Sequence, residues 1–359
     1  MKRLFFIFLF LFHSWGYGIE IKISILGIFK PKAIRVLNQE NHQVYEIRIG
    51  GQNQILVNGK NQIFFTLESS LPLELSVPSK IKRSYVGKIL ISNQSGILQI
   101  VNQIEIEDYI KSVVNSEIGA APLEALKTQA VLARSKAYEA IMKSGKKAYH
   151  LTDLTDSQVY KGFEAVTKKS SRAAAETEGE VLWFEGKIPE IFYASTCAGG
   201  TVLPKDVWGK NSPGYEAVPC GYCTQSPHYQ NWKWEVSLQE LEKIFNVSHL
   251  KHIEVQSSDS FGRVLILSLV FEDGVRRVLK AEDFRIIIGR YYRKWGLVKS
   301  SFFSIVELQD KLVFVGKGLG HGVGLCQYGA KEMAFLGWDY QKILNYYYPK
   351  MTIGQWEVK

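Results

Sequence analysis

Residues 101–145 decide the fold of this chain and read VNQIEIEDYIKSVVNSEIGAAPLEALKTQAVLARSKAYEAIMKSG. The first part predicts a strand that leads into a short helix. Pro122 then suits the first turn of a long helix, and Gly145 supplies a stop. Small and apolar residues recur along this helix at helical spacing: Leu126, Ala130, Ala133 and Ala137. Their small size allows the helix to pack closely against its neighbour.

The preceding residues predict a small β-rich module over residues 19–100. We expect strands at residues 21–26, 44–49, 63–67 and 88–91. Turn signals separate these strands at Gly50-Gly51, at Asn58-Gly59 and between Asn93 and Gly96. We find no catalytic constellation in this module.

The residues after the long helix mix both kinds of secondary structure. We expect a second helix at about residues 167–177, strands within residues 180–195 and 263–280, and a helix after the glycine-rich stretch near the end. The chain has no internal repeat. The predicted fold class is therefore α+β.

The first residues have the pattern of an export signal. Lys2 and Arg3 precede an unbroken apolar run at residues 4–12, LFFIFLFLF, and small residues at Gly16 and Gly18 suit cleavage after Gly18. The run is shorter than the roughly 20 apolar residues that cross a bilayer. We expect a signal peptide at residues 1–18 and an exported protein in the periplasm or on the outer face of the cytoplasmic membrane. An uncleaved, membrane-anchored start is the alternative.

The chain is basic. Its formal net charge is +9, and removal of Lys2 and Arg3 with the signal peptide leaves 9 − 2 = +7. A basic surface favours nucleic acid, anionic lipid or the acidic polymers of a cell wall, and charge alone does not choose among them or exclude a solvated surface.

Several short segments carry residue types suited to sugar chemistry. Glu117 lies in VVNSEIGAAP (residues 113–122), where apolar neighbours would raise the pKa of a carboxyl as a general acid requires. In DLTDSQVYKG (residues 153–162), Gln158 and Tyr160 alternate and would share one face of a strand. Amide and phenol groups suit sugar hydroxyl and acetamido groups. Each pattern by itself is also compatible with a purely structural role.

Glycine-rich segments supply the remaining candidates. FYASTCAGGT (residues 192–201) runs from a strand into Gly199 and Gly200, where the backbone can approach a ligand closely. GKGLGHGVGLCQYGA (residues 316–330) is not a Walker phosphate loop, because Gly-Lys-Ser/Thr is missing. Its many glycines indicate a tight loop that presents His321 ahead of Gln327 and Tyr328.

In this order, the segments resemble the SpoIID/LytB family, the stage II sporulation protein D and amidase enhancer relatives. The resemblance covers roughly residues 101–356, and the matching segments are VNQIEIEDYIKSVVNSEI, ALKTQAVLARSKA, SQVYKG, AGGT, DVWG, GHGVGLCQYGAKEMA and ILNYYYP. It implies a SpoIID-like catalytic domain over residues 101–356. It also implies an exported protein that acts on peptidoglycan glycan strands and not on nucleic acid.

The resemblance further implies an activity and a catalytic residue. Characterised sporulation members are lytic transglycosylases, which cleave between N-acetylmuramic acid and N-acetylglucosamine and leave 1,6-anhydro ends. Their essential glutamate falls on Glu117. Candidates for holding the glycan or orienting Glu117 are Gln158, Tyr160, Gly199, Gly200, His321, Gln327 and Tyr328. No cofactor is required for this reaction.

The sequence leaves two other functions open. A muramidase would add water and use a second carboxylate, for which Asp153 or Asp156 is available. A non-catalytic, wall-binding protein would instead stimulate a partner N-acetylmuramoyl-L-alanine amidase. The resemblance also implies a preference for glycan strands from which an amidase has removed the stem peptides.

The cysteines offer a possible zinc site. Some family members bind zinc through a His and two Cys in the segment that here reads YHLTDLTDSQVY (residues 149–160), but Ser157 replaces the last Cys. A different set, Cys197, Cys220, Cys223 and His228, has the residue types of a closed structural zinc site. A disulfide from Cys197 to Cys220 or Cys223, or unpaired buried thiols, are the alternatives. Cys326 is expected to be a small packed residue.

Overall fold

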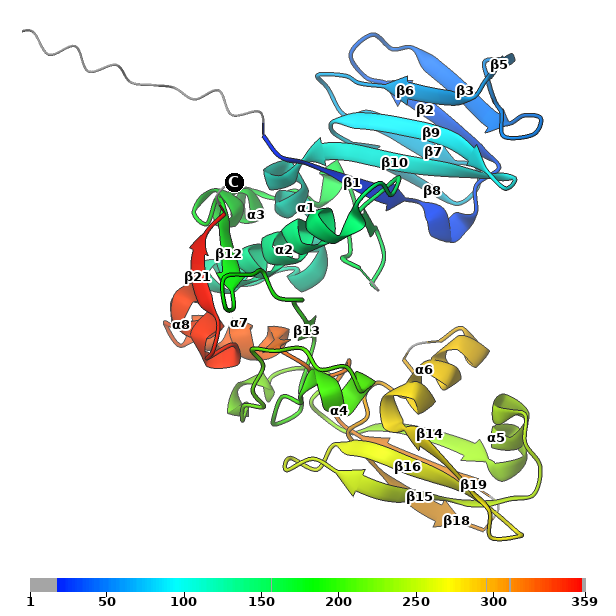
Figure 1. Cartoon of the computed structure of the whole chain (residues 1–359), viewed down its shortest axis with the longest axis vertical. Coiled ribbons are helices and arrows are strands. Elements are labelled where there is room, and N and C mark those ends of the chain that lie inside the picture. Colours follow the sequence, from blue (N-terminus) through cyan, green and yellow to red (C-terminus); the bar gives the residue numbers. More distant parts are fainter. Residues whose placement is uncertain (1–17, 156, 295, 310, 357–359) are drawn as a thin grey trace, which may run out of the picture.

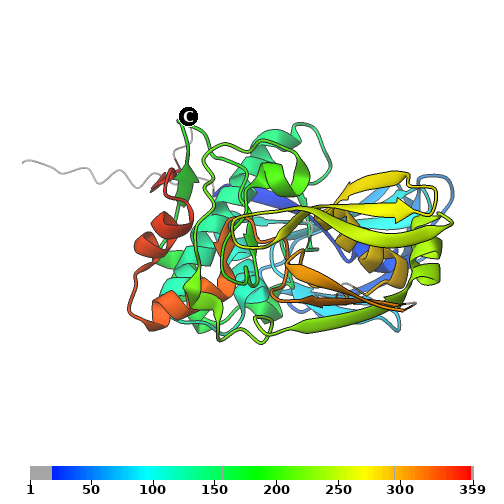
Figure 2. The ribbon, with the colours of Figure 1, turned by 90° about the horizontal axis from the view of Figure 1, so that it is seen from below.

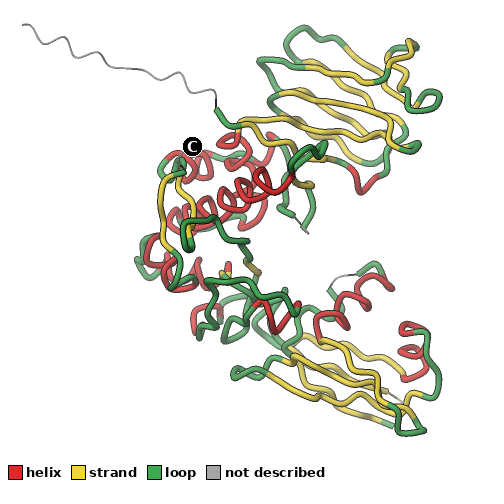
Figure 3. The backbone as a smooth tube through the Cα atoms, in the orientation of Figure 1, coloured by secondary structure: helices red, strands yellow, loops and turns green. Residues whose placement is uncertain are grey.

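The computed structural model describes residues 18–155, 157–294, 296–309 and 311–356. The predicted signal peptide thus lies almost wholly outside the described residues. Strand-rich units stand at the two ends of the molecule and helices lie between them (Figures 1 and 3). The α+β fold class is confirmed. Among the described residues, no helix combines the length and apolar character that a membrane span requires.

In the described part of the chain, the N-terminal strands form a pair of sheets. One has the order β11-β1-β10-β9-β6, with β1 at Glu20–Ile25, β6 at Phe64–Leu67, β9 at Lys88–Gln94, β10 at Ile97–Glu105 and β11 at Leu151–Thr152. The other has the order β5-β4-β3-β2-β7-β8, with β2 at Ala33–Asn38, β3 at Val44–Ile49, β4 at Ile55–Val57, β5 at Lys60–Gln62, β7 at Leu73–Val77 and β8 at Ile81–Tyr85. A short 3-10 turn, η1, occupies Gly27–Phe29.

The N-terminal sheets and the first helices share a core. In β1, apolar residues alternate with polar ones, so that Ile21 and Ile23 are fully buried. Side chains of both sheets join the same buried cluster as Ala130 and Ala133 of the long helix. The predicted boundary between residues 100 and 101 falls inside β10, which pairs with β1 over residues 100–105. The N-terminal module therefore packs directly against the helices through a shared core.

The helices follow β10 directly. These are α1 (Ile106–Ile118), α2 (Leu123–Ser144) and α3 (Lys168–Ala175), with the 3-10 turn η2 at Phe163–Ala165. Gly119 ends α1 at φ +64°, a conformation that suits glycine, and Pro122 caps the start of α2. The expected close packing of α2 is found, since its alanine face is buried.

Arg134 joins these helices through a fully buried guanidinium group. Its Nε and Nη2 each donate a hydrogen bond of 2.7 Å to the Glu107 carboxylate on α1. Its Nη1 donates to the carbonyl of Glu180 at 3.1 Å. A buried charge of this kind is tolerated because it is paired and hydrogen-bonded.

The C-terminal residues return to the helices. β12 (Glu180–Trp183) pairs with β21 (Thr352–Gln355), and β13 (Tyr193–Ala194) pairs in parallel with β20 (Leu325–Cys326). Around them lie α4 (Pro204–Trp208), η3 (Gly221–Cys223), α7 (Gln327–Phe335) and α8 (Tyr340–Tyr347). The β13–β20 pair brings together segments that are far apart in sequence.

A further α+β unit with its own core is inserted between β13 and β20. Its sheets have the orders β14-β19-β18 and β15-β16-β17. The elements are β14 (Trp232–Ser237), α5 (Leu238–Phe245), β15 (Leu250–Ser258), β16 (Val264–Phe271), β17 (Arg276–Lys280), α6 (Ala281–Tyr292), β18 (Phe303–Leu308) and β19 (Lys311–Gly316). This unit and the N-terminal sheets project to the same side of the helices (Figures 1 and 2).

Candidate active site

Glu117 lies in the last turn of α1, with its side chain partly buried. The backbone N–H of Val159 donates to Oε1 at 2.6 Å, and the hydroxyl of Tyr193 donates to the same oxygen at 3.0 Å. No hydrogen bond from the described residues reaches Oε2. One carboxyl oxygen is therefore fixed in place while the other stays available.

Burial raises the pKa of Glu117 above its ordinary value. The hydrogen bonds from Val159 and Tyr193 and the positive charges of Lys136 and Lys161 act in the opposite direction, and the net pKa shift is upward. A carboxyl with a raised pKa can hold a proton at a pH at which an exposed glutamate would have lost it.

A chain of buried polar groups supports Tyr193. The Tyr193 hydroxyl accepts a hydrogen bond of 3.4 Å from Nε2 of Gln158, which also donates to the carbonyl of Ala133 at 3.3 Å. The hydroxyl of Tyr109 donates to Oε1 of Gln158 at 3.1 Å. The network orients the phenol that holds the Glu117 carboxyl.

The structure corrects the strand predicted for Gln158 and Tyr160. Of the two predicted roles, Gln158 has the one of orienting Glu117, through Tyr193. Residues 157–162 form a loop rather than a strand, and the two side chains have exposed fractions of 0% and 1%. Tyr160 donates to Oδ1 of Asn102 at 2.7 Å inside the core. Because the loop packs against α1 and the sheet, both side chains enter the interior. Gln158 and Tyr160 therefore support the site from the protein interior, and their side chains are not exposed to a glycan.

Gln327, although it lies 210 residues from Glu117 in the chain, is close to it in space, and Tyr328 follows Gln327. Nε2 of Gln327 contacts the carbonyl of Glu117 at 3.4 Å and Oε1 of Gln129 at 3.2 Å. Gln327 thus holds the end of α1. The Tyr328 side chain is partly exposed, with Nζ of Lys331 4.7 Å from the centre of its ring, so it is open to contact with a ligand.

His321 is a structural residue of the glycine-rich loop. Its Nδ1 accepts a hydrogen bond of 3.0 Å from the N–H of Val323, and its ring lies 5.0 Å from that of Trp208. Burial lowers the pKa of His321 to about 3, so the ring is neutral over the physiological range. Within the described chain, no hydrogen bond connects it to Glu117.

Gly199 and Gly200 also differ from their predicted role. Gly199 has φ +126°, and its carbonyl accepts from the N–H of Cys220. A Cβ on Gly200 would lie 2.3 Å from the ring of Phe261. These glycines are required where the backbone folds tightly around the cysteines, and they do not contact Glu117.

The cysteine cluster has a different membership from the predicted one. The structure places Cys326 with Cys197, Cys220 and Cys223, and their Sγ atoms all lie within 4.8 Å of one another. His228 is outside this group. The parallel pairing of β13 with β20 brings Cys326 to the site, which spacing along the sequence does not reveal.

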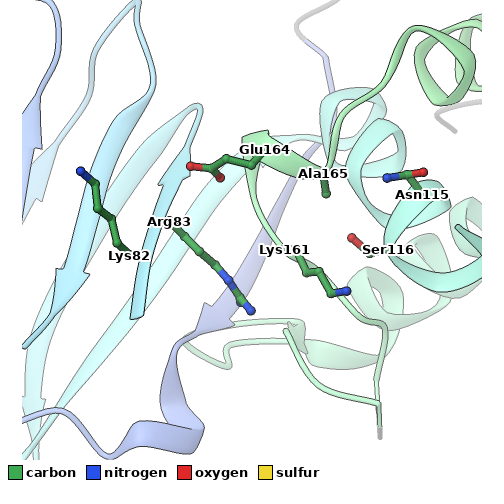
Figure 4. Close-up of a pocket in the computed structure, with 7 residues that line it drawn as sticks. All are labelled: Lys82, Arg83, Asn115, Ser116, Lys161, Glu164 and Ala165. Atoms are coloured by element: carbon green, nitrogen blue, oxygen red, sulfur yellow. The ribbon is translucent and has the colours of Figure 1, made fainter. Parts of the chain in front are cut away.

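A surface pocket of about 280 Å³ lies between the N-terminal sheet and α1. Lys82 and Arg83 of β8 line one side, Asn115 and Ser116 of α1 the other, and Lys161 lies between them (Figure 4). Glu164 and Ala165 complete the lining. The pocket adjoins the turn of α1 that carries Glu117, and its charged lining residues are three cations and one carboxylate.

Tyr193 and Lys136 are site residues that the sequence analysis missed. Tyr193 lies in the segment FYASTCAGGT, in which only the glycines carry a recognisable pattern. Lys136 lies on α2, and its Nζ is 5.7 Å from the centre of the Tyr193 ring. Only the tertiary packing shows that Tyr193 donates a hydrogen bond to Glu117 and that the charge of Lys136 acts on the Glu117 carboxyl.

Comparison with known proteins finds similarity over the region that contains Glu117. A family model described as stage II sporulation protein, SpoIID, matches residues 94–184, the part that carries Glu117 and its loop partner Val159. This match and the similarity to stage II sporulation protein D support membership of the SpoIID family. Family membership, together with similarity to an amidase enhancer, supports a cell-wall-related role.

The relatives extend beyond the matched SpoIID region. The chain is 28% identical to an uncharacterized protein of Brachyspira hyodysenteriae, over 90% of this chain and 85% of the relative. It is 26% identical to stage II sporulation protein D of Bacillus subtilis, over 72% of this chain and 76% of the relative. It is 27% identical to the amidase enhancer of Bacillus subtilis, over 68% of this chain and 40% of the relative.

Proposed function

We propose that this SpoIID-family protein is a lytic transglycosylase that cleaves peptidoglycan glycan strands with Glu117 as both acid and base. The observation that carries the proposal is the state of the Glu117 carboxyl. Oε1 is held by the Val159 N–H and the Tyr193 hydroxyl, Oε2 is free of such bonds from the described residues, and burial raises the pKa.

The proposed reaction begins with the proton on Oε2, because Oε1 already accepts from two donors. Glu117 gives this proton to the glycosidic oxygen between N-acetylmuramic acid and N-acetylglucosamine, and the bond to the muramic anomeric carbon breaks. An oxocarbenium-like centre forms. The Glu117 carboxylate then removes the proton of the muramic 6-hydroxyl, whose oxygen closes onto that carbon. No water is added, and the carboxyl regains its proton.

The surroundings of Glu117 favour this single-carboxyl reaction over hydrolysis. Asp153, a candidate second carboxylate, has a side chain that is only 4% exposed. Its Oδ2 accepts from the N–H of Leu26 at 2.9 Å and lies 3.8 Å from Nη1 of Arg83. A carboxylate so occupied is poorly suited to activating water. Asp156, the other candidate, lies outside the described residues.

The basic pocket beside α1 suits a glycan without stem peptides. When an amidase removes the peptide, each muramic acid keeps a free lactyl carboxylate. Lys82 pairs with Glu74 at 2.7 Å and Arg83 lies 3.8 Å from Asp153, so Lys161 is the lining cation best placed to meet such a carboxylate. We therefore propose that the protein acts on strands that an amidase has stripped. Lys161→Gln should weaken binding of stripped strands more than Lys60→Gln, a matched change on exposed β5.

The deciding experiment is mass spectrometry of purified, peptide-free glycan strands after incubation with the protein. A transglycosylase releases fragments whose masses sum to that of the substrate, and each cleavage leaves one new anhydro end. Products heavier by one water would support a muramidase and refute the proposed reaction. Strands that retain their stem peptides serve as the comparison, and equal rates on both substrates would contradict the proposed order of action.

A non-catalytic function is the second candidate, because one relative is named an amidase enhancer. In that case the wild-type protein would leave glycan strands intact and accelerate a purified N-acetylmuramoyl-L-alanine amidase. Glu117→Gln would then stimulate the amidase as well as the wild type does. This pair of results would replace the lytic reaction as the function.

We also propose that the protein is exported to the periplasm or the outer face of the cytoplasmic membrane. The basic start and the apolar run at residues 4–12 support this proposal. N-terminal sequencing of the mature protein should find Ile19 at or near the first position. An intact Met1 on a cytoplasmic protein would contradict it.

A further inference from the structure

The four cysteines of the chain gather at one buried point. Cys197 follows β13, Cys220 precedes η3, Cys223 ends η3, and Cys326 ends β20. All four side chains are buried as free thiols, and their Sγ atoms lie within 4.8 Å of one another. The C-x2-C spacing of Cys220 and Cys223 is that of a zinc-binding turn.

The distances fit a single tetrahedral ion. Four sulfurs at the usual Zn–S distance of about 2.3 Å stand about 3.8 Å apart. The Sγ atoms of Cys197 and Cys223 are 3.8 Å apart. A disulfide instead requires a sulfur separation of about 2.05 Å, and clusters of several irons hold their cysteine sulfurs farther apart than a single ion does.

Polar groups around the sulfurs complete the arrangement. The N–H groups of Cys197 and Gly329 point at the Cys326 sulfur, at 3.3 and 3.4 Å. The Tyr347 hydroxyl lies 3.2 Å from the Cys220 sulfur. A Cβ on Gly329 would lie 2.9 Å from the Cys220 sulfur and 2.1 Å from the Tyr347 hydroxyl. Such donors orient metal-bound thiolates and tune their charge.

A buried cation, Arg263, stands beside the cluster and is compatible with negative charge there. Arg263 has an exposed fraction of 0%, and its Nη2 donates to the carbonyl of Cys197 at 2.6 Å. Its Nε and Nη1 have no hydrogen-bond partner among the described residues. Asp259 and Glu282 act on it electrostatically, and the Phe302 ring centre lies 5.7 Å from its guanidinium carbon. A buried charge normally requires a partner of opposite sign. Four thiolates around one Zn²⁺ carry a net charge of −2, which would offset the guanidinium.

We propose that Cys197, Cys220, Cys223 and Cys326 bind one structural zinc ion as a closed four-thiolate site. Binding replaces the four thiol protons with the metal. Because the cysteines fill every tetrahedral position, the ion has no place for a substrate and takes no part in the reaction.

The proposed zinc site connects the two segments that position Glu117. Tyr193, which donates to the Glu117 carboxyl, lies on β13 just ahead of Cys197. Gln327, which contacts the Glu117 carbonyl, follows Cys326. The ion therefore links the two segments that position the carboxyl, although it does not touch the substrate.

Elemental analysis of the full mature chain, purified without chelator, tests the site directly. We expect about one zinc per chain. Cys220→Ser and Cys326→Ser should each lose most of this zinc and lower the melting temperature. His228→Ala is the matched control: it removes the nearby candidate ligand that the structure leaves outside the cluster, and should retain the zinc.

A thiol titration keeps the proposal testable if the serine variants fail to fold. Addition of a mercurial reagent to the wild-type protein should release one zinc, detected with a metal-sensitive dye, as four thiols are consumed. Metal-free protein with four free thiols, an oxidised cysteine pair, or iron in place of zinc would each overturn the proposal. Loss of zinc in His228→Ala but not in Cys326→Ser would overturn the ligand set. None of these readouts depends on glycan cleavage, so they remain informative if the lytic reaction is refuted.

Discussion

Replacing Glu117 by glutamine isolates the chemistry of the proposed catalytic group. The amide has nearly the same shape as the carboxyl, and its Oε1 can still accept from the Val159 N–H and the Tyr193 hydroxyl. The NH₂ group then takes the place of Oε2, to which no described residue donates. Folding and glycan binding should therefore be preserved, while proton donation and proton removal both fail.

The expected loss follows from the two uses of this group. A positioned general acid or base typically contributes about 10²–10⁴-fold to the rate. Glu117 serves in bond cleavage and in ring closure, so we expect a loss of kcat of about 10⁴-fold or more. This corresponds to about 5 kcal/mol of activation free energy. The Michaelis constant should change little.

The assay is the release of anhydro-ended fragments from peptide-free strands, with strand pull-down as the measure of binding. Asp153→Asn is the control, because it removes a carboxylate near the site but keeps an acceptor for the Leu26 N–H. We expect a rate change below about 10-fold for this variant. Near-normal turnover by Glu117→Gln, or an equally large loss in Asp153→Asn, would show that the single-glutamate reaction is wrong.

Further predictions concern pH, the phenol and the buried ion pair. Burial raises the pKa of Glu117 above 4.5, so its protonation favours the folded state fully below pH 4.5, and this contribution is lost as pH rises through the folded pKa. The melting temperature of the wild type should therefore fall relative to that of Glu117→Gln over this window, and a constant difference would contradict the raised pKa. Tyr193→Phe removes a donor worth about 1.5–3 kcal/mol to a charged group, so kcat should fall about 10- to 100-fold and the high-pH limb of the rate profile should move to higher pH. Tyr328→Phe should leave that limb in place, and an unmoved limb in Tyr193→Phe would reduce Tyr193 to a packing role. Arg134→Met strands the Glu107 carboxylate and should cost about 3 kcal/mol, at the low end for a buried pair because Glu107 is 25% exposed; denaturant unfolding that shows less than about 1 kcal/mol would refute this.

The sequence by itself determined the elements and the principal site residue. The strand predicted at residues 44–49 coincides with β3, because alternating apolar residues can bury only one face of a strand. The helix ends at Pro122 and Gly145 were predictable, because the backbone conformations of proline and glycine are local properties. Glu117 was identified by its motif, and the structure places it in a setting that suits acid–base chemistry.

Only the tertiary structure decided which residues serve Glu117 and which complete the cysteine cluster. Gln158 and Tyr160 were expected on a strand face, but the loop packs against the helices and turns both side chains inward. Tyr193 and Cys326 reach their places through the parallel pairing of β13 with β20, across more than a hundred residues of chain. Periodicity and spacing indicate the local secondary structure around a residue. Long-range strand pairings are instead set by the burial of whole elements against one another.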